Sequence, residues 1–327
     1  MKRFSLILLC VLLIFGSGCK KDDNKLSSTQ VMMDTVVTIT IWDSDIGTLN
    51  GAMELCRQYE QLLSRTVETS DIAKLNQTGV ATVSPDTAAL LKLSLDVSAR
   101  SNGAFDATIL PLVELWDINN ANTPPSQSSI DEAIKSVDYR SITVDGTHVN
   151  TNGAKLDLGG IAKGFIADKV HEYLKSNGVS KAIINLGGNV QLIGSNDGKD
   201  YTVGIQKPFG LHGESAVLLK LQNKTAVTSG IYERYFEFDD KIYHHVLDPK
   251  TGYPADNGIQ SVTILSDSSA LADSLSTACL VLGVEDGTHL AESFNADVIF
   301  LMSDGSITTS KNLKVDQNGP TPTVAYK

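Results

Sequence analysis

The chain has 327 residues, a hydrophobic content of 42% and a formal net charge of −11. This length allows one large domain or two small ones, and the composition is that of an ordinary soluble globular protein. The negative charge disfavours nucleic acid as a partner, because phosphate backbones are bound by basic surfaces.

The first 18 residues are predicted to be a bacterial lipoprotein signal peptide. Two basic residues precede the apolar run 6–15, which is too short to span a bilayer as a mature helix. Small residues then lead to Cys19, the expected lipidation site, although Gly16 stands where a leucine is common. Ordinary cleavage and a retained anchor are the alternatives. Lipidation at this cysteine would hold the protein in the bacterial cell envelope, outside the cytoplasm.

Residues 19–28 are predicted to form a polar tether, followed by a single globular unit over 29–327. Cys56 and Cys279 lie in apolar helical patterns and are expected to be buried free thiols, with a disulfide as the alternative.

Hydrophobic periodicity and turn residues predict the following elements in chain order. They are a strand at 31–42, a helix at 49–63, a loop with a short helix at 64–79, a helix after Ser84, a surface loop at 119–129, a helix at 129–137, strands near 141–144 and 155–158, a helix at 161–176, a hairpin at 181–194, a second hairpin over 233–238 and 242–247, a strand at 261–265, a helix that carries Asp273, and closing strands at 295–302 and 306–309. Several hairpins and few β-α-β units indicate an α+β fold, with mixed, largely antiparallel sheets and packed helices.

The segment 155–164 reads Lys-Leu-Asp-Leu-Gly-Gly-Ile-Ala-Lys-Gly, which predicts a short strand, a glycine turn and the start of a helix. The two glycines allow backbone groups to approach a ligand closely. Lys163 can reach a phosphate from the first helical turn, and Asp157 can accept a hydrogen bond from a ligand. A glycine turn with a solvated lysine is the alternative, since the spacing of a P-loop is absent.

Asp273 and Thr277 are four residues apart on one helix, so their oxygens face the same way. Such a pair suits Mg²⁺, although backbone carbonyls, phosphate oxygens and water must complete an octahedron. The alternative is that Asp273 caps or pairs with a neighbour, while the opposite face of the helix supplies the core. Together with the glycine turn, the pair suggests an enzyme that acts on a nucleotide pyrophosphate.

Two further groups of residues are candidates for a site. Phe105 could stack on a flat ring or fill the core, and Asp106 needs a partner because it adjoins an apolar run. His244 and His245 alternate in a predicted strand, so one is expected to face a site and the other water. A histidine there can act as a general base or be satisfied by a backbone carbonyl.

Seven segments occur in a fixed order: 33–35, 103–106, 157–164, 185–188, 229–234, 245–254 and 270–277. In this series the chain resembles the FAD:protein FMN transferase family, also called ApbE, over nearly all of the sequence after the lipoprotein segment. The resemblance implies an enzyme that uses Mg²⁺, takes FAD, transfers FMN to a Thr or Ser hydroxyl of a target protein and releases AMP. Family members lie outside the cytoplasmic membrane, often as lipoproteins, and their targets include membrane redox subunits.

The resemblance also implies roles for single residues. The positions that would contact FAD are Met33, Ala104, Phe105, Asp106, Asp157 and Lys163, with Val246 or Leu247 against the nucleotide. The metal positions are Gly160, through its carbonyl, Asp273 and Thr277, and the catalytic histidine is His245 rather than His244.

This chain departs from the family pattern at two positions. Thr66 stands where several members have a flavin-contacting tyrosine, and Tyr59 is too early to replace it. Asp34 stands where many have glycine.

Three alternatives to the transferase remain open. An FAD pyrophosphatase would use water in place of the protein hydroxyl, and an FAD-binding lipoprotein would perform no transfer. A solute-binding lipoprotein would have two similar α/β lobes, which the hairpins argue against.

Overall fold

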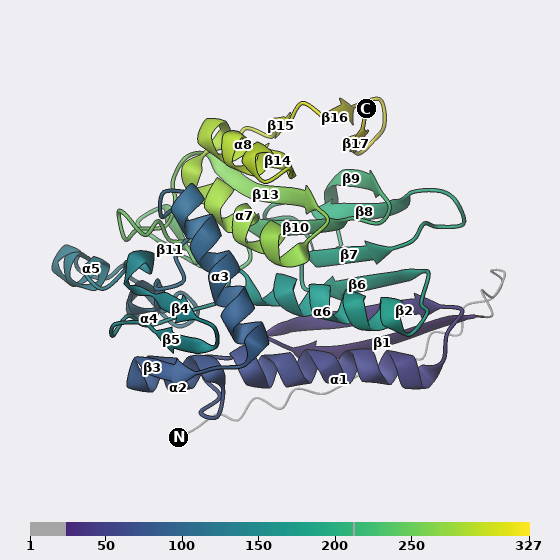
Figure 1. Ribbon diagram of the computed structural model, residues 1–327. Coiled ribbons are helices and arrows are strands. Elements are labelled where there is room, and N and C mark those ends of the chain that lie inside the picture. The colour runs from purple at the N-terminus through teal and green to yellow at the C-terminus, as the bar shows by residue number, and fades with distance from the viewer. Residues whose placement is uncertain (1–23, 212) are drawn as a thin grey trace, which may run out of the picture.

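The computed structural model describes residues 24–211 and 213–327 (Figure 1). The signal peptide and Cys19 lie outside these residues. Within the described ranges, no helix combines the length and apolarity needed to cross a membrane.

The central element is an eight-stranded sheet in which all neighbouring strands are antiparallel. In spatial order its strands are β1 (Lys25–Met32), β2 (Thr35–Trp42), β6 (Ala182–Leu186), β7 (Asn189–Ile193), β10 (Thr225–Gly230), β13 (Ile259–Ser266), β14 (Asp297–Met302) and β15 (Ile307–Thr309). The antiparallel order agrees with the α+β class predicted from the hairpins.

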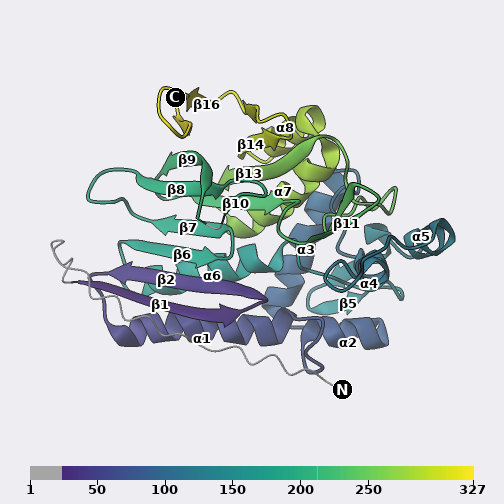
Figure 2. The same ribbon diagram turned by 180° about the vertical axis from the view of Figure 1, so that it is seen from behind.

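Helices cover one face of this sheet, as Figures 1 and 2 show from opposite sides. They are α1 (Ile46–Leu63), α6 (Ala162–Ser176) and α7 (Ser269–Leu282), with α3 (Pro85–Arg100) against α7 and α8 (Val284–Ser293) following it. Buried aliphatic side chains of the helices and the sheet form one core cluster. The helix predicted after Ser84 is capped by this residue, since Ser84 Oγ accepts a hydrogen bond from Thr87 N at 3.0 Å. Ser268 caps α7 in the same way, with Leu271 N at 3.3 Å.

A second sheet packs on the opposite face of the central one. It contains β16 (Leu313–Asp316), β17 (Thr323–Tyr326), β9 (Ser215–Leu221) and β8 (Tyr201–Gln206) in that order, and its β17–β9 pair is parallel. Val217 and Leu219 from this sheet share a core cluster with Leu192 and Leu265 from the central sheet. The molecule therefore has three layers: helices, a large sheet and a small sheet.

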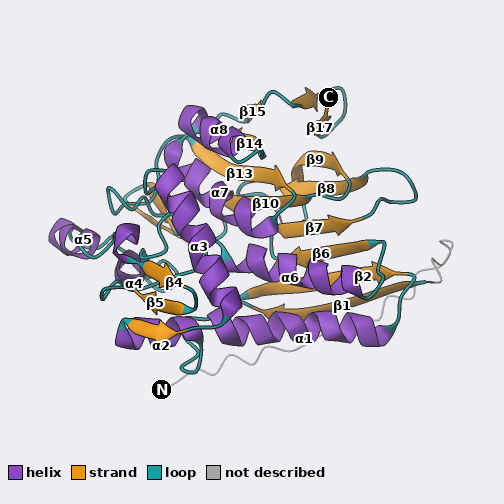
Figure 3. Ribbon diagram, viewed as in Figure 1, coloured by secondary structure: helices purple, strands orange, loops and turns teal. Residues whose placement is uncertain are grey.

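The remaining elements gather at one end of the central sheet (Figure 3). They are α2 (Asp71–Thr78), the three-stranded sheet β3 (Val80–Thr82), β5 (His148–Asn150) and β4 (Thr143–Asp145), the helices α4 (Leu110–Trp116) and α5 (Gln127–Ile134), the short 3₁₀ helix Tyr139–Ser141, and the hairpin β11 (Tyr235–Phe238) and β12 (Lys241–His244). Trp116 joins α4 to the segment after this hairpin, because its Nε1 donates to Gly252 O at 2.7 Å.

Some expected element boundaries differ from those of the structure. The segment 31–42 is two strands, because Met33 and Asp34 have φ values of 53° and 56° and form a tight turn. β1 begins at Lys25, so neither the tether limit at residue 28 nor the domain start at 29 holds. The polar residues there pair across the hairpin, with hydroxyl contacts of 2.9 Å between Ser27 and Thr40 and 3.0 Å between Thr29 and Thr38.

The segment 155–158 joins no sheet, contrary to prediction. It is held instead by the Asn76 amide, which accepts from Leu156 N at 2.6 Å and donates to Leu156 O at 2.9 Å. The expectation for the cysteines is confirmed, since Cys56 and Cys279 are buried and free.

Candidate functional site

The predicted site residues meet where α6 begins and α7 passes it. A Cβ atom at Gly164 would lie 2.2 Å from Ser269 O, so only glycine permits this approach of the two helices. Gly164 N donates to Asp273 Oδ2 at 2.9 Å. The lysine-bearing turn of α6 is thereby fastened to the acidic residue of α7.

Gly160 brings the glycine turn to the same point. A Cβ atom there would lie 3.2 Å from both Thr277 Oγ1 and Phe105 Cε2. The three predicted metal positions, Gly160, Asp273 and Thr277, are therefore adjacent, with the Phe105 ring beside them. Thr277 is also supported from the sheet, because its Oγ1 lies 3.5 Å from Ser229 Oγ on β10.

Asp273 is more enclosed than the sequence pattern indicates. Its exposed fraction is 5%, and α7 is buried on nearly every side rather than on one apolar face. Burial raises the pKa of the Asp273 carboxyl, while the positive charge of Lys163 and the Gly164 N–H oppose that rise. Its Oδ1 receives no hydrogen bond from the described residues, so this oxygen is available to a ligand.

The donor set fits Mg²⁺ in kind but is incomplete. Carboxylate, hydroxyl and backbone carbonyl oxygens are the hard ligands that Mg²⁺ prefers. No group of three His, Cys, Asp or Glu side chains able to hold a metal occurs among the described residues. A metal here must therefore take further oxygens from a bound phosphate and water.

Asp168 on α6 holds the start of α7 in place. Its carboxylate accepts hydrogen bonds from Ser269 N at 2.7 Å, Ala270 N at 3.0 Å, Ser268 Oγ at 2.9 Å and Gln191 Nε2 at 3.0 Å. A carboxylate is favourable at a helix N-terminus, because it satisfies free N–H groups and complements the helix dipole. The sequence pattern did not indicate this acid, which comes from about a hundred residues away.

The two histidines are distinguished by the partners of their ring nitrogens. His244 is 3% exposed, its Nε2 lies 2.9 Å from Ala255 O, and its Nδ1 accepts from Val246 N at 3.3 Å. A carbonyl can only accept, so Nε2 carries the proton and both nitrogens are used. The expectation that the second histidine faces water is therefore wrong for His244.

His245 has a described partner at one ring nitrogen, Nδ1. Its Nδ1 lies 3.3 Å from Arg234 O and must donate to it, which leaves the Nε2 lone pair available. Burial, followed by the positive charge of Arg234, lowers the pKa of His245 to about 3, and Lys163 acts in the same direction. The imidazole is therefore neutral at physiological pH.

Lys163 and Arg234 are the two basic side chains whose positive charge lowers the pKa of this imidazole. Neither forms an ion pair with a described residue. Two unpaired cations beside a neutral imidazole suit a pyrophosphate. Arg234 lies in the segment 229–234, but the sequence did not indicate a role for it.

The buried carboxylate of Asp106 accepts hydrogen bonds at both of its oxygens. Its Oδ1 accepts from Thr108 N at 2.8 Å and Thr108 Oγ1 at 2.7 Å, and its Oδ2 accepts from Tyr139 N at 2.9 Å. Burial raises the pKa of this carboxyl despite these hydrogen bonds. Asp106 therefore orders its own loop, in which Ala104 and Phe105 are also buried.

Asp157 is engaged by an arginine that the sequence did not single out. Arg65 Nε lies 2.9 Å from Asp157 Oδ2, and Gly159 N donates to Oδ1 at 2.7 Å. Arg65 directly precedes Thr66, the position at which the resemblance leads one to expect a flavin-contacting tyrosine. Thr66 itself is exposed and donates from its backbone N to Ser64 Oγ at 3.2 Å.

Met33, Val246 and Leu247 occupy different surroundings. Met33 is in the hairpin turn, and its N donates to Glu60 Oε1 at 2.7 Å. Val246 belongs to the main core cluster with Phe105, whereas Leu247 packs in the separate cluster around Trp116. The two nucleotide candidates therefore pack in different clusters.

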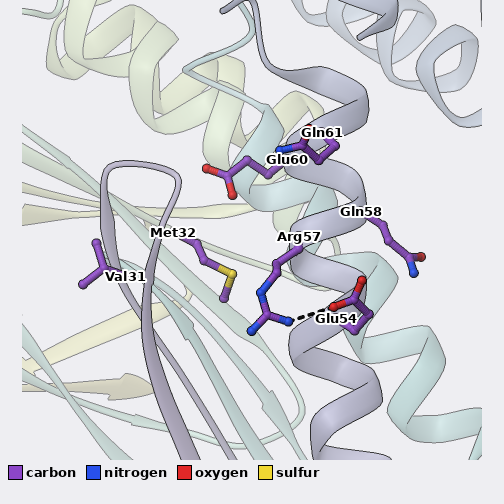
Figure 4. Close-up of a pocket in the computed structure, with 7 residues that line it drawn as sticks. All are labelled: Val31, Met32, Glu54, Arg57, Gln58, Glu60 and Gln61. Atoms are coloured by element: carbon purple, nitrogen blue, oxygen red, sulfur yellow. Dashed lines mark hydrogen bonds and ion pairs between the residues drawn. The ribbon is translucent and has the colours of Figure 1, made fainter. Parts of the chain in front are cut away.

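A hollow of about 610 Å³ lies between this turn and α1 (Figure 4). It is lined by Val31, Met32, Glu54, Arg57, Gln58, Glu60 and Gln61. An ion pair of 2.8 Å joins Arg57 to Glu54 in its wall. None of the residues around Asp273 or His245 lines this hollow, so it is separate from the site described above.

Comparisons with known proteins agree with this geometry. The model of the ApbE family matches residues 33–301. Relatives called FAD:protein FMN transferase include one from Klebsiella pneumoniae (34% identical, 88% of this chain and 93% of the relative) and one from Treponema pallidum (32% identical, 94% and 93%). Similar solved structures are the ApbE protein of Thermotoga maritima (31% identical, TM-score 0.80, 88% of this chain and 97% of that chain) and the flavin transferase ApbE of Vibrio cholerae (25% identical, TM-score 0.77, 87% and 96%).

Proposed function

The chain belongs to the ApbE family and is a flavin transferase, and we propose that it moves FMN from FAD onto a Thr or Ser hydroxyl of a target protein, with Mg²⁺ as cofactor and AMP as the leaving product. The proposal is carried by one observation. Gly160, Asp273 and Thr277 adjoin the start of α6, and the charge of Lys163 reaches both Asp273 and His245.

The proposed binding roles of the residues follow from their charges. Asp273, Thr277 and the Gly160 carbonyl would hold Mg²⁺, which when bound neutralises pyrophosphate charge and stabilises departing AMP. Lys163 and Arg234 would bind phosphate oxygens, since both cations are unpaired among the described residues. Phe105 and Val246 supply the apolar wall beside them.

His245 is the proposed general base. Its Nε2 takes the proton of the acceptor hydroxyl while the hydroxyl oxygen attacks the FMN-side phosphorus of FAD. The bond from that phosphorus to the bridging oxygen breaks, and AMP leaves with the oxygen. A pKa of about 3 makes the His245 imidazole a weak base in the protein without FAD. The phosphate anions of bound FAD favour the protonated imidazole and therefore raise this pKa.

The place of action is also a proposal. Lipidation of Cys19 would hold the enzyme at the outer side of a bacterial membrane, close to a membrane redox subunit as acceptor. The lipoprotein-like sequence around Cys19 supports this location.

The experiment that tests the proposal uses the purified chain with FAD and Mg²⁺, with and without an acceptor protein. We expect FMN to become covalently attached to the acceptor and AMP to be released in equal amount. Free FMN formed at the same rate with or without acceptor would indicate an FAD pyrophosphatase. Unchanged FAD would indicate a binding protein.

A further inference from the structure

Two exposed aromatic side chains touch near the proposed base, and an exposed leucine follows one of them by two residues in the chain. Phe209 and Leu211 come from the loop between β8 and β9, Tyr235 begins β11, and their exposed fractions are 42%, 75% and 39%. The rings of Phe209 and Tyr235 meet edge to face with centroids 5.3 Å apart. We call these three residues the aromatic lip.

The aromatic lip is joined to His245 by a single stretch of backbone. Tyr235 directly follows Arg234, whose carbonyl accepts from His245 N at 3.2 Å and lies 3.3 Å from His245 Nδ1. Tyr235 is the register partner of His244, so its ring starts from the His244 face of the β11–β12 hairpin, while its backbone adjoins His245 through Arg234. A molecule that presents a hydroxyl to His245 Nε2 therefore comes close to this end of the hairpin, where the lip begins.

The lip is held in an ordered but unfavourable conformation. Phe209 has a φ of 55°, a value that non-glycine residues with bulky side chains rarely adopt. Its loop is closed by hydrogen bonds from Lys207 N to Glu214 O at 2.9 Å and from Gly210 N to Lys207 O at 3.0 Å. Its ring also contacts Tyr232, at 6.0 Å between centroids. The backbone of Phe209 is thus strained while its ring stays partly exposed, an arrangement that contributes little to folding and is typical of a binding surface.

We propose that the aromatic lip is the docking surface for the acceptor protein, and that it binds apolar side chains next to the acceptor Thr or Ser. This inference rests on the proposed function. A flavin transferase of this kind has a protein as its second substrate, whose surface must cover the residues around His245 when its hydroxyl reaches Nε2. Exposed aromatic and leucine side chains are suited to such contacts, because buried aromatic anchors supply much of the binding energy at protein interfaces. The phosphates of FAD instead require the cations Lys163 and Arg234.

The test compares two synthetic peptides, each with one threonine and no serine. In the first peptide Leu and Phe flank the threonine, and in the second peptide Gln and Asn flank it. Peptide KM, kcat and the Kd for FAD are measured for the wild type, Phe209→Ser and Leu211→Ser. The matched control is Ile46→Ser, an apolar residue that is 59% exposed at the start of α1. All four proteins are compared by thermal melting.

We expect the wild type to favour the Leu/Phe peptide by about tenfold in KM, which corresponds to one good apolar anchor. Each lip variant should remove most of this preference and leave kcat, FAD affinity and the KM of the Gln/Asn peptide unchanged. Ile46→Ser should match the wild type throughout.

Two results would overturn the docking surface. The first applies when both peptides are flavinylated: the lower KM for the Leu/Phe peptide is absent from the wild type, or it is retained in both lip variants. The other is a loss of FAD affinity that matches the loss for the peptide, which would assign the lip to the flavin ring. Free FMN or unchanged FAD with both peptides and with whole acceptor proteins would instead reject the proposed function itself.

Discussion

At the scale of residues, His244 and His245 differ in the number of described hydrogen-bond partners of their imidazole rings. Both ring nitrogens of His244 have a partner, whereas only Nδ1 of His245 does. His245→Ala should lower the rate of FMN transfer by about 10²–10⁴-fold, the usual contribution of a general base, with little effect on FAD binding. His244→Ala should instead reduce thermal stability, since it leaves Ala255 O and Val246 N without their partner. Single-turnover transfer, FAD titration and thermal melting separate the two effects. Equal losses of transfer in both variants would remove His245 from the mechanism.

Asp273→Ala should abolish Mg²⁺ binding and Mg²⁺-dependent turnover while the protein remains folded. The substitution removes the one carboxylate of the proposed metal site, and it also relieves the cost of burying that charge. The matched control is Asp297→Ala, another buried carboxylate, which accepts from Ser310 Oγ and Asn312 Nδ2. The control should lose stability but keep the Mg²⁺ requirement of the wild type. Wild-type activity of Asp273→Ala at limiting Mg²⁺, or unchanged Mg²⁺ binding by calorimetry, would contradict the metal assignment.

The depressed pKa of His245 also predicts how stability depends on pH. The pKa of His245 is about 3 in the folded state, whereas a histidine in an unfolded chain has a pKa near 6.5. Between about pH 6.5 and 3, His245 therefore binds a proton in the unfolded chain but not in the folded one. This contribution is fully present above about pH 6.5 and is lost as pH falls toward 3. Between about pH 7.5 and 5 it amounts to at most about 2 kcal/mol.

Denaturant unfolding of the wild type and His245→Gln at several pH values measures this term. The free energy of unfolding should fall less steeply with acid in the variant, because glutamine does not titrate. Parallel curves for the two proteins would show that His245 is not held neutral by the fold.

At the scale of elements, the joint between α6 and α7 decides the geometry of the site. Gly164 allows the helices to touch, and Asp168 binds the first N–H groups of α7. α7 carries both Asp273 and Thr277, so a shift of this helix moves two proposed metal ligands together. The site therefore depends on a residue that contacts neither metal nor substrate.

Asp168→Asn should cost about 1–2 kcal/mol of stability and raise the Mg²⁺ concentration for half-maximal binding several-fold, since a charged acceptor at a helix N-terminus is lost. The control is Ser84→Ala, which removes the cap of α3, a helix without proposed ligands. It should lower stability by about 1 kcal/mol and leave the Mg²⁺ requirement unchanged. An Asp168 variant with reduced stability but wild-type Mg²⁺ affinity would limit this residue to a role in folding.

At the scale of the whole molecule, the start of β1 at Lys25 shortens the tether. Residues 19–24 span at most about 20 Å when fully extended, so a lipid on Cys19 would keep the enzyme within that distance of the membrane. Such confinement raises the effective concentration of membrane-bound acceptors without changing the site.

Cys19→Ser should therefore release the protein from membranes and leave its activity in solution intact. Fractionation of cells that express each form, followed by a transfer assay with a soluble acceptor, measures both effects. A processed Cys19→Ser protein that stays with the membrane would contradict the anchor. A folded, released form without activity would show that the N-terminal segment does more than tether.

Local chemistry is what the sequence by itself determined. The serine cap of α3 and the turns of the two hairpins act over a few residues, and the positions of this helix start and of both hairpins were predicted correctly. The order of the motifs was sufficient to predict the family, because each motif is a short run of adjacent residues. The α+β class followed from the number of hairpins.

Only the tertiary structure decided which distant groups meet. Arg65 on Asp157, Asp168 on the start of α7 and Phe209 on Tyr235 are contacts between segments far apart in the chain, and no local pattern specifies them. The same is true of the segment 155–158, whose strand-like sequence is bound by Asn76 instead of a neighbouring strand. Packing of the layers sets these distances, and the chemistry of a side chain depends on the neighbours that packing brings to it.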